Sequence, residues 1–90
     1  MWEIYEGPKA RKSLKKLPHE ILKRYEKWKD IVMISGPGGL RNIRGFNDEK
    51  LHGIWEGFRS SRLNIHDRVL YRIEGGQLFV EVFDITAHKY

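Results

Sequence analysis

The sequence predicts an α+β domain, with two N-terminal helices on one face of a small, mostly antiparallel sheet in the order β-α-α-β-β-β, with an optional further strand. Three observations predict it. Apolar residues between positions 9 and 32 recur at helical spacing. After Gly53 the pattern becomes that of strands, and Gly75 and Gly76 separate two such strands as in a β-hairpin. The 90 residues suffice for a single domain, residues 1–90, with one hydrophobic core.

The N-terminal third is predicted to form a strand and a helical hairpin. Residues 2–6 alternate in polarity, which predicts a short strand, and Gly7 and Pro8 end it. Pro8 suits a first helical turn, and Pro18 separates the first helix from the second. The apolar stripes of the two helices are Ala10, Leu14 and Leu17, then Ile21, Leu22, Tyr25, Trp28 and Val32. Basic side chains fill most other positions, so the hairpin has one apolar and one basic side.

The remaining chain is predicted to be mostly β. A Gly- and Pro-rich breaker at 35–39 is not a phosphate-binding Walker loop, because no Gly-Lys-Ser/Thr follows it. We expect a short edge strand at 40–45 and a polar loop at 46–53. Three strands are then expected at residues 54–63, 68–74 and 77–85.

Counting outward from a two-residue turn at Gly75 and Gly76 predicts the register of the last hairpin. Glu74 then pairs with Gln77. The face toward the helices carries the pairs Val69–Val82, Tyr71–Val80 and Ile73–Leu78. The other face carries Arg72–Phe79, Leu70–Glu81 and Arg68–Phe83.

An odd-numbered loop between the first two of these strands places Arg62 opposite Arg68, on the face away from the helices. Two guanidinium groups at opposed positions, with Cβ atoms roughly 5 Å apart, repel each other. Either an anion lies between them or they spread into water, with Glu81 as a diagonal partner of Arg72. Thr86 continues the parity of the helix-facing residues, so the last residues reach Arg68 only if the chain leaves the sheet or bulges near Thr86.

The composition narrows the function classes. A net charge of +5 and a pI near 9.6 favour a polyanionic partner, nucleic acid above all, although a basic helix surface that aids solubility explains the charge too. The absence of cysteine excludes disulfides, zinc ribbons and thiol catalysis. The apolar run at 31–34 is too short to span a membrane and no signal peptide is visible, so we expect a cytoplasmic protein. The four histidines lack metal-ligand spacing, and we expect neither metal nor cofactor.

Residues 55–63, 66–73 and 84–90 together resemble the RelE/ParE superfamily of bacterial toxins. The stretch Arg-Val-Leu-Tyr at 68–71 and the terminal His-Lys-Tyr at 88–90 carry the resemblance, and Leu-Arg-Asn-Ile-Arg-Gly at 40–45 is similar to the strand that precedes the sheet in these toxins. The resemblance implies a toxin neutralised by a cognate antitoxin protein. The terminal His-Lys-Tyr is closer to the RelE, YoeB and HigB-like enzymes, which cleave mRNA on the 70S ribosome, than to the ParE-like inhibitors of DNA gyrase.

The resemblance also implies site residues. It assigns Arg68 to the phosphate, His88 to acid or base catalysis, and Tyr90 to base stacking or proton transfer. Further phosphate-binding or substrate-binding cations are Arg59, Arg62 and Lys89. Some relatives carry two lysines before the matching arginine, whereas this chain has arginines and serines.

Arginine is a poor proton donor or acceptor. The acid and base work therefore falls to His88, Tyr90 and His66, of which His66 has no clear family counterpart. The basic helices are expected to contact 16S rRNA phosphates. Two alternatives stay open: a ParE-like gyrase inhibitor that binds protein without catalysis, and a non-catalytic RNA-binding module.

Overall fold

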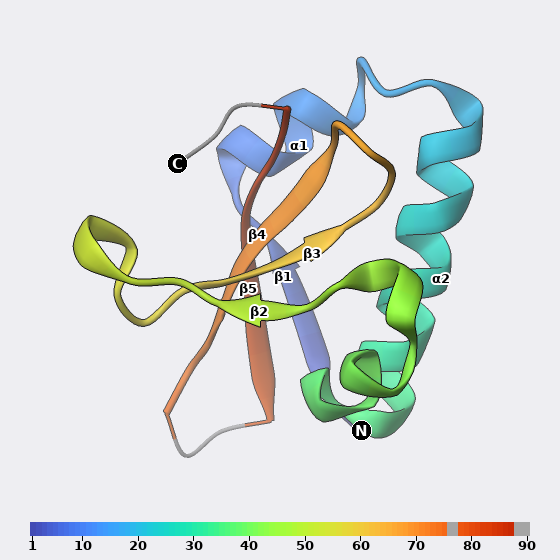
Figure 1. Cartoon of the computed structure of the whole chain (residues 1–90). Coiled ribbons are helices and arrows are strands. Elements are labelled where there is room, and N and C mark those ends of the chain that lie inside the picture. The colour runs from blue at the N-terminus through green and yellow to red at the C-terminus, as the bar shows by residue number, and fades with distance from the viewer. Residues whose placement is uncertain (76–77, 88–90) are drawn as a thin grey trace.

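The structure is a computed structural model that describes residues 1–75 and 78–87, and it confirms the α+β class (Figure 1). The described strands form one five-stranded sheet in the order β1-β5-β4-β3-β2, in which β1 runs parallel to β5 and the other neighbours are antiparallel. The elements are β1 (Glu3–Glu6), α1 (Pro8–Leu14), α2 (His19–Ser35), β2 (Glu49–Lys50), β3 (Arg59–Arg62), β4 (Arg68–Ile73) and β5 (Phe79–Thr86). No helix in these residues is long and apolar enough to cross a membrane.

Helix α1 begins, and helix α2 begins and ends, where proline and glycine predict, whereas α1 ends at Leu14, before Pro18. Pro8 occupies the first turn of α1, and the N–H of Gly7 before it donates to the Val82 carbonyl (2.9 Å), which joins the helix start to β5. Helix α2 starts after Pro18 and ends at Gly36, whose φ of 75° suits glycine. A Cβ at Gly36 would also lie 2.6 Å from the Trp2 indole nitrogen, so a larger residue is excluded there.

The hydrophobic core lies between α2 and one face of the sheet, as the apolar stripes predict. The Trp28 ring packs edge-on against Tyr71 of β4 with centroids 5.2 Å apart, and it stacks on Tyr25 at 5.8 Å. Further core residues come from α1, α2 and the two central strands, and they are Ala10, Val32, Val69, Val80, Val82 and Ile85. The opposite side of β2–β5 faces away from these residues, and we call it the open face.

The segment before the sheet differs from the prediction. Residues 40–45 do not form an edge strand, because they lie in the short 3-10 helices Pro37–Asn42 and Arg44–Phe46, whose buried Leu40 and Phe46 side chains pack in the core. The edge strand is instead β2, inside the stretch expected to be a polar loop. The run at 54–63 contributes only β3, since a 3-10 helix at Gly53–Trp55 and the left-handed Gly57 (φ 92°) precede it.

The register of the last hairpin is two residues away from the prediction. Ile73 pairs with Val80 and Tyr71 with Val82, because the loop is longer than two residues and is closed by the Glu74 N–H donating to the Phe79 carbonyl (3.0 Å). The predicted partner of Glu74, Gln77, lies outside the described residues. As far as Tyr71–Val82 this shift of two keeps the paired residues on their predicted faces, and Val69 and Tyr71 are buried toward the helices as expected.

A β-bulge lies between Leu70 and Tyr71 and changes the side on which the end of β5 emerges. Beyond it Leu70 pairs with Asp84 and Arg68 pairs with Thr86. Phe83 is the additional residue of the bulged strand. The reach of the last residues to Arg68 required that the chain leave the sheet or bulge near Thr86, and the structure has a bulge closer to the hairpin. Because paired residues share a face, Thr86 lies on the open face beside Arg68.

Candidate active site

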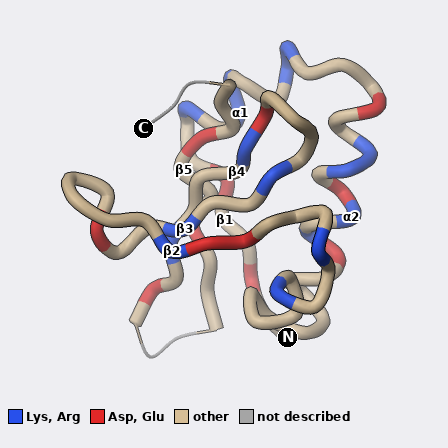
Figure 2. Tube along the Cα trace, in the orientation of Figure 1, with Lys and Arg blue, Asp and Glu red and all other residues tan. Residues whose placement is uncertain are grey.

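Arg62 and Arg68 face each other across β3 and β4 on the open face, as the loop arithmetic predicts. Their partners in the register set the face: Ser61 pairs with the core residue Val69, so the next pair along the strands points the opposite way. Figure 2 shows basic positions side by side on these two strands. Both side chains are partly buried. The sheet therefore brings two guanidinium groups together.

The charge of this arginine pair is not neutralised within the described residues. Neither Arg62 nor Arg68 forms an ion pair with a described carboxylate. The Nε of Arg62 is buried, and it has no hydrogen-bond partner in that part of the chain. Like charges at opposed positions of a sheet destabilise it, and a buried donor without an acceptor is also costly. A bound anion relieves the repulsion between the two guanidinium groups, so the pair has the properties of a phosphate site.

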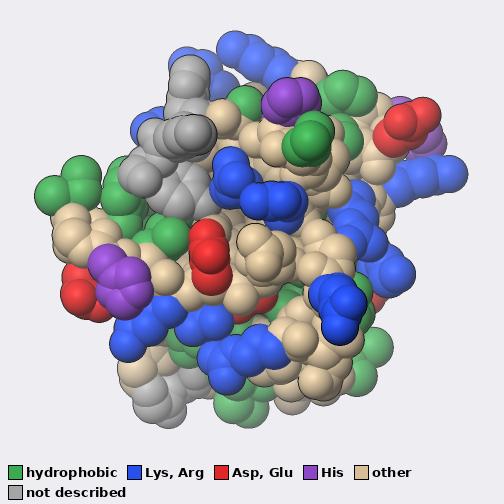
Figure 3. Space-filling model, viewed as in Figure 1, with side chains coloured by type: hydrophobic (Ala, Val, Ile, Leu, Met, Phe, Trp, Pro, Cys, Tyr) green, Lys and Arg blue, Asp and Glu red, His purple; other side chains and the backbone are tan. Residues whose placement is uncertain are grey.

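Glu49 adds a carboxylate to the open face that the sequence did not reveal. It pairs with Ser60, which pairs with Leu70, and all three therefore lie on the face of the arginine pair. Glu49 is exposed and is the diagonal neighbour of Arg62, within reach of a long side chain. Figure 3 shows basic side chains gathered at the centre of this view, with an acidic one beside them. The polar stretch at 46–53 gives no strand signal, so only the pairing of β2 with β3 reveals Glu49.

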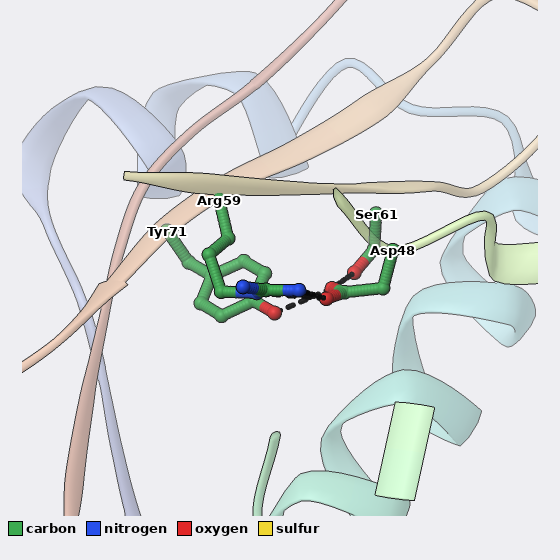
Figure 4. A network of polar contacts seen from close by, with 4 residues as sticks. All are labelled: Asp48, Arg59, Ser61 and Tyr71. Carbon is green, nitrogen blue, oxygen red and sulfur yellow. Dashed lines mark hydrogen bonds and ion pairs between the residues drawn. The ribbon is translucent and has the colours of Figure 1, made fainter. Parts of the chain in front are cut away.

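Arg59 is separated from the other two arginines because it points to the helix side of the sheet. It pairs with the core residue Tyr71, and its Nε and Nη2 donate to one carboxylate oxygen of Asp48 at 2.9 and 2.8 Å. Ser61 Oγ donates to the other oxygen at 2.6 Å, and the Tyr71 hydroxyl donates to it as well. Figure 4 shows the side chains of Arg59, Ser61 and Tyr71 converging on that of Asp48. The structure thus places Arg59 in an internal network, away from Arg62 and Arg68.

This network, which we call the Asp48 network, is buried and electrostatically closed. The Asp48 side chain is 0% exposed and that of Arg59 17%. Burial lowers the pKa of Arg59, but its hydrogen bond and attraction to Asp48 outweigh burial, so its pKa is raised. Burial, and next the charge of Asp48, raise the pKa of Tyr71. Arg59 therefore stays charged and Tyr71 stays protonated at neutral pH.

The remaining candidates are placed as follows. Arg72 lies on the open face but is neutralised, because its Nε is 2.8 Å from Glu81 and 3.4 Å from Glu74. His66 is exposed in the β3–β4 loop, where its backbone N–H donates to Asn64 Oδ1 (2.8 Å). This loop ends beside the arginine pair. The predicted site residues His88, Lys89 and Tyr90 lie outside the described residues.

Comparison with known proteins gives the fold a context. No protein-family model matches the sequence, and no curated protein matches it. Among solved structures, the YoeB–YefM toxin–antitoxin complex of Staphylococcus aureus aligns with a TM-score of 0.77 at 20% identity over 99% of both chains. The archaeal RelE–RelB complex of Pyrococcus horikoshii aligns at 0.74 and 19% identity, over 94% of this chain and 92% of that one. The YoeB/ParE toxin of Agrobacterium tumefaciens aligns at 0.74 and 14%, over 97% and 99%.

The chain has the fold of the RelE/ParE toxins. This confirms the architecture that the motifs at 55–63, 66–73 and 84–90 implied. The aligned regions cover nearly all of this chain and of these neighbours, so the similarity extends over the whole fold. A shared fold leaves the chemistry to the residues of the site.

Proposed function

We propose that this protein is the toxin of a toxin–antitoxin pair and an endoribonuclease that cleaves mRNA on the ribosome. The observation that carries the proposal is the arginine pair, Arg62 and Arg68, which has no described counter-ion and lies on the open face of the sheet. The fold supports it, since similar structures are toxins solved with antitoxins. Cleavage by the 2′-hydroxyl of the RNA itself needs no metal ion.

The reaction requires a cationic binding site for one phosphodiester group. The 2′-oxygen attacks the adjacent phosphorus and forms a new P–O bond, while the bond from phosphorus to the leaving 5′-oxygen breaks. Charge on the phosphoryl oxygens grows in the transition state, and pre-oriented guanidinium groups stabilise it. We assign this role to Arg62 and Arg68, with Lys89 as a further substrate-binding cation. The products are a 2′,3′-cyclic phosphate and a 5′-hydroxyl.

Two proton transfers complete the reaction. A base takes the proton of the attacking 2′-hydroxyl, and an acid protonates the leaving 5′-oxygen. Glu49 is a base candidate, because it lies on the open face diagonal to Arg62. His88 is an acid or base candidate: it follows Thr86, the partner of Arg68, by two residues, and two residues of chain span at most about 7 Å. Histidine suits either task near neutral pH.

Tyr90 and His66 complete the set of candidates. Tyr90 would stack on a base or take part in proton transfer, because it is two residues beyond His88. His66 is exposed in the loop that joins the strands of the arginine pair, and it remains a second acid or base candidate. Arg59 has no place in this cationic binding site, since Asp48 holds it on the helix side.

The basic helices suit ribosomal RNA, and the open face suits an acidic antitoxin segment. Exposed lysines and arginines follow one another along α1, its C-terminal end and α2, where Figure 2 shows basic positions; they are Lys9, Arg11, Lys12, Lys15, Lys16, Lys23 and Lys27. Contacts of these residues with 16S rRNA phosphates would be independent of sequence and weakened by salt. An antitoxin segment with carboxylates opposite Arg62 and Arg68 would block the substrate phosphate.

Primer extension on an mRNA in a translating extract tests the proposal. We expect new 5′ ends after addition of the protein when ribosomes are present, and none when the mRNA is incubated with the protein alone. A parallel assay measures DNA supercoiling by gyrase. Intact mRNA with blocked supercoiling would overturn the proposal in favour of the gyrase inhibitor. Salt-sensitive ribosome binding without cleavage would overturn it in favour of a non-catalytic module.

A further inference from the structure

We infer that Asp48 is a positioning residue, which holds Glu49 on the open face beside the arginine pair. This inference rests on the proposed function, because it assigns Glu49 to the site. Asp48 directly precedes Glu49, the first residue of β2, and consecutive residues of a chain that enters a strand point to opposite faces. Asp48 is anchored on the helix side by Arg59, Ser61 and Tyr71. Its neighbour Glu49 must therefore emerge on the open face, where the register places it opposite Ser60.

The backbone hydrogen bonds of β2 fix its register against β3 only weakly. The strand consists of two residues at the edge of the sheet, paired as Glu49–Ser60 and Lys50–Arg59. Beyond it the Leu51 N–H donates to the Phe58 carbonyl at 3.0 Å. So short a strand is a weak determinant of register, and a slip of one residue would turn Glu49 away from the arginine pair.

The Asp48 side chain supplies the hold that the backbone lacks. Its two oxygens accept hydrogen bonds from Arg59 and Ser61 on β3 and from Tyr71 on β4, so one carboxylate joins β3 and β4 to the start of β2 (Figure 4). Asn47 before it adopts a left-handed conformation with φ of 41°, which turns the chain into β2. The three donors project from β3 and β4, and Asp48 accepts hydrogen bonds from all of them at once.

A role in register explains this network better than stability does. A buried ion pair is often no more stabilising than apolar residues of the same volume, and its best-attested benefit is to select one arrangement over others. Here the selected arrangement also sets Arg62, since Ser61 and Arg62 are consecutive on β3. The Asp48 network, on the helix side of the sheet, thus fixes β2 and β3, which carry Glu49 and Arg62 on the open face.

A double-mutant cycle on cleavage separates positioning from general support. Asp48→Asn is combined with Glu49→Gln, and kcat and KM are measured in the ribosomal cleavage assay. We expect Asp48→Asn to lower kcat by about 10²-fold with KM nearly unchanged. In the Glu49→Gln background the same change should cost less than about 3-fold, because the group that it positions is already absent. Equal losses in both backgrounds would overturn the inference.

Two milder variants keep the test valid if Asp48→Asn does not fold. Ser61→Ala and Tyr71→Phe each remove one donor and leave the Asp48–Arg59 pair in place. Each should lower kcat by roughly 10-fold, again with loss of the effect in the Glu49→Gln background. The control is Glu81→Gln, which breaks the Arg72–Glu81 pair on the same sheet and should leave kcat unchanged.

Amide hydrogen exchange tests the inference without any activity. Tyr71→Phe should increase the exchange rate of the Leu51 amide, which closes the β2–β3 pairing, by at least about 10-fold. Amides of β4 and β5 should keep their protection. Unchanged exchange at Leu51, or a uniform increase throughout the sheet, would overturn the positioning role. If the wild-type protein cleaves no RNA while Tyr71→Phe still increases exchange selectively at Leu51, only the proposed function is refuted.

Discussion

Arg59 and Arg62 lie at the two ends of the same strand and have opposite environments. Arg59 points toward the helices and donates through two nitrogens to one oxygen of a fully buried carboxylate. Arg62 points to the open face, opposite Arg68, and its buried Nε has no acceptor among the described residues. The first arginine is satisfied by the fold, and the second is not. An unsatisfied charge that the fold brings next to a like charge indicates a ligand, whereas a satisfied one indicates architecture.

The comparison also explains why strand alternation matters more than sequence proximity here. Both arginines fit the resemblance to phosphate-binding positions, and they are only three residues apart. Three residues along a strand reverse the face, so one of them had to leave the site. Asp48 determines which one, because its carboxylate lies on the helix side. The variants below test the two environments in turn.

Removal of the buried carboxylate should have the largest effect. Asp48→Asn leaves the Arg59 charge in a mostly buried place without its counter-ion, and loss of one partner of a buried pair costs about 3–5 kcal/mol. Urea unfolding followed by tryptophan fluorescence measures the free energy of unfolding. A decrease in the free energy of unfolding below about 1 kcal/mol would mean that the Asp48 network does not stabilise the fold.

Loss of one phosphate-binding cation should come next. Arg68→Gln is expected to lower the cleavage rate by about 10²–10³-fold, because one stabilising donor of the transition state is removed. The matched control is Arg72→Gln, on the same strand and the same face but already neutralised by Glu81 and Glu74. Its cleavage rate should stay within about 3-fold of wild type. If both variants lose cleavage rate to a similar extent, the lack of a counter-ion does not distinguish Arg68 from Arg72.

Alkaline pH should destabilise the fold through its buried tyrosines. Burial, and next the hydrogen bond to Glu6, raise the pKa of Tyr25, and burial and the charge of Asp48 raise that of Tyr71. Above the unfolded-state pKa near 10, the unfolded chain loses these protons while the folded protein retains them, so stability present below pH 10 falls as pH rises. Each tyrosine should cost about 1 kcal/mol by pH 11.

Thermal unfolding between pH 8 and 11 measures this loss. Tyr25→Phe should make the decline above pH 10 shallower, since one of the two protons is removed. Tyr5→Phe is the control, because Tyr5 is exposed on β1. An unaltered slope in Tyr25→Phe would show that the alkaline transition has another origin.

The smallest effect should have the opposite sign. Arg62→Gln removes one of two opposed like charges, and we expect it to raise the free energy of unfolding by about 0.2–1 kcal/mol while cleavage is lost. Such a gain in stability with a loss of activity is typical of residues kept for function. Measurements at low and high salt sharpen the result, because the gain should shrink as salt screens the repulsion. If Arg62→Gln destabilises the protein, Arg62 stabilises the fold as Arg59 does.

The sequence predicted the fold where periodicity is strong. The stripes through Tyr25, Trp28 and Val32 identified the helix face, and the odd loop between β3 and β4 gave the Arg62–Arg68 pairing. The register of the last hairpin was wrong by two, since Ile73 pairs with Val80 and not with Leu78. The predicted faces survived that error as far as Val82, because strand side chains alternate with a period of two, and they reverse beyond the bulge.

The site was harder to predict, for physical reasons that concern single residues. A two-residue strand has no periodicity, so neither Asp48 nor Glu49 could be assigned a face from the stretch at 46–53. The bulge at Phe83 depends on how β5 packs against its neighbours, and no local turn signal marks it. Arg59 resembled a phosphate ligand because its charge is visible in the sequence and its buried partner is not.

Arginine side-chain NMR tests the central claim most directly. The Nε–H signals of the protein are followed while a short single-stranded RNA is added whose 2′-hydroxyl at the target linkage is replaced by hydrogen, so that it binds without being cleaved. The account predicts that the signals of Arg62 and Arg68 shift together and saturate, while those of Arg59 and Arg72 stay in place. Shifts at Arg59 or Arg72 with none at Arg62 and Arg68 would contradict it.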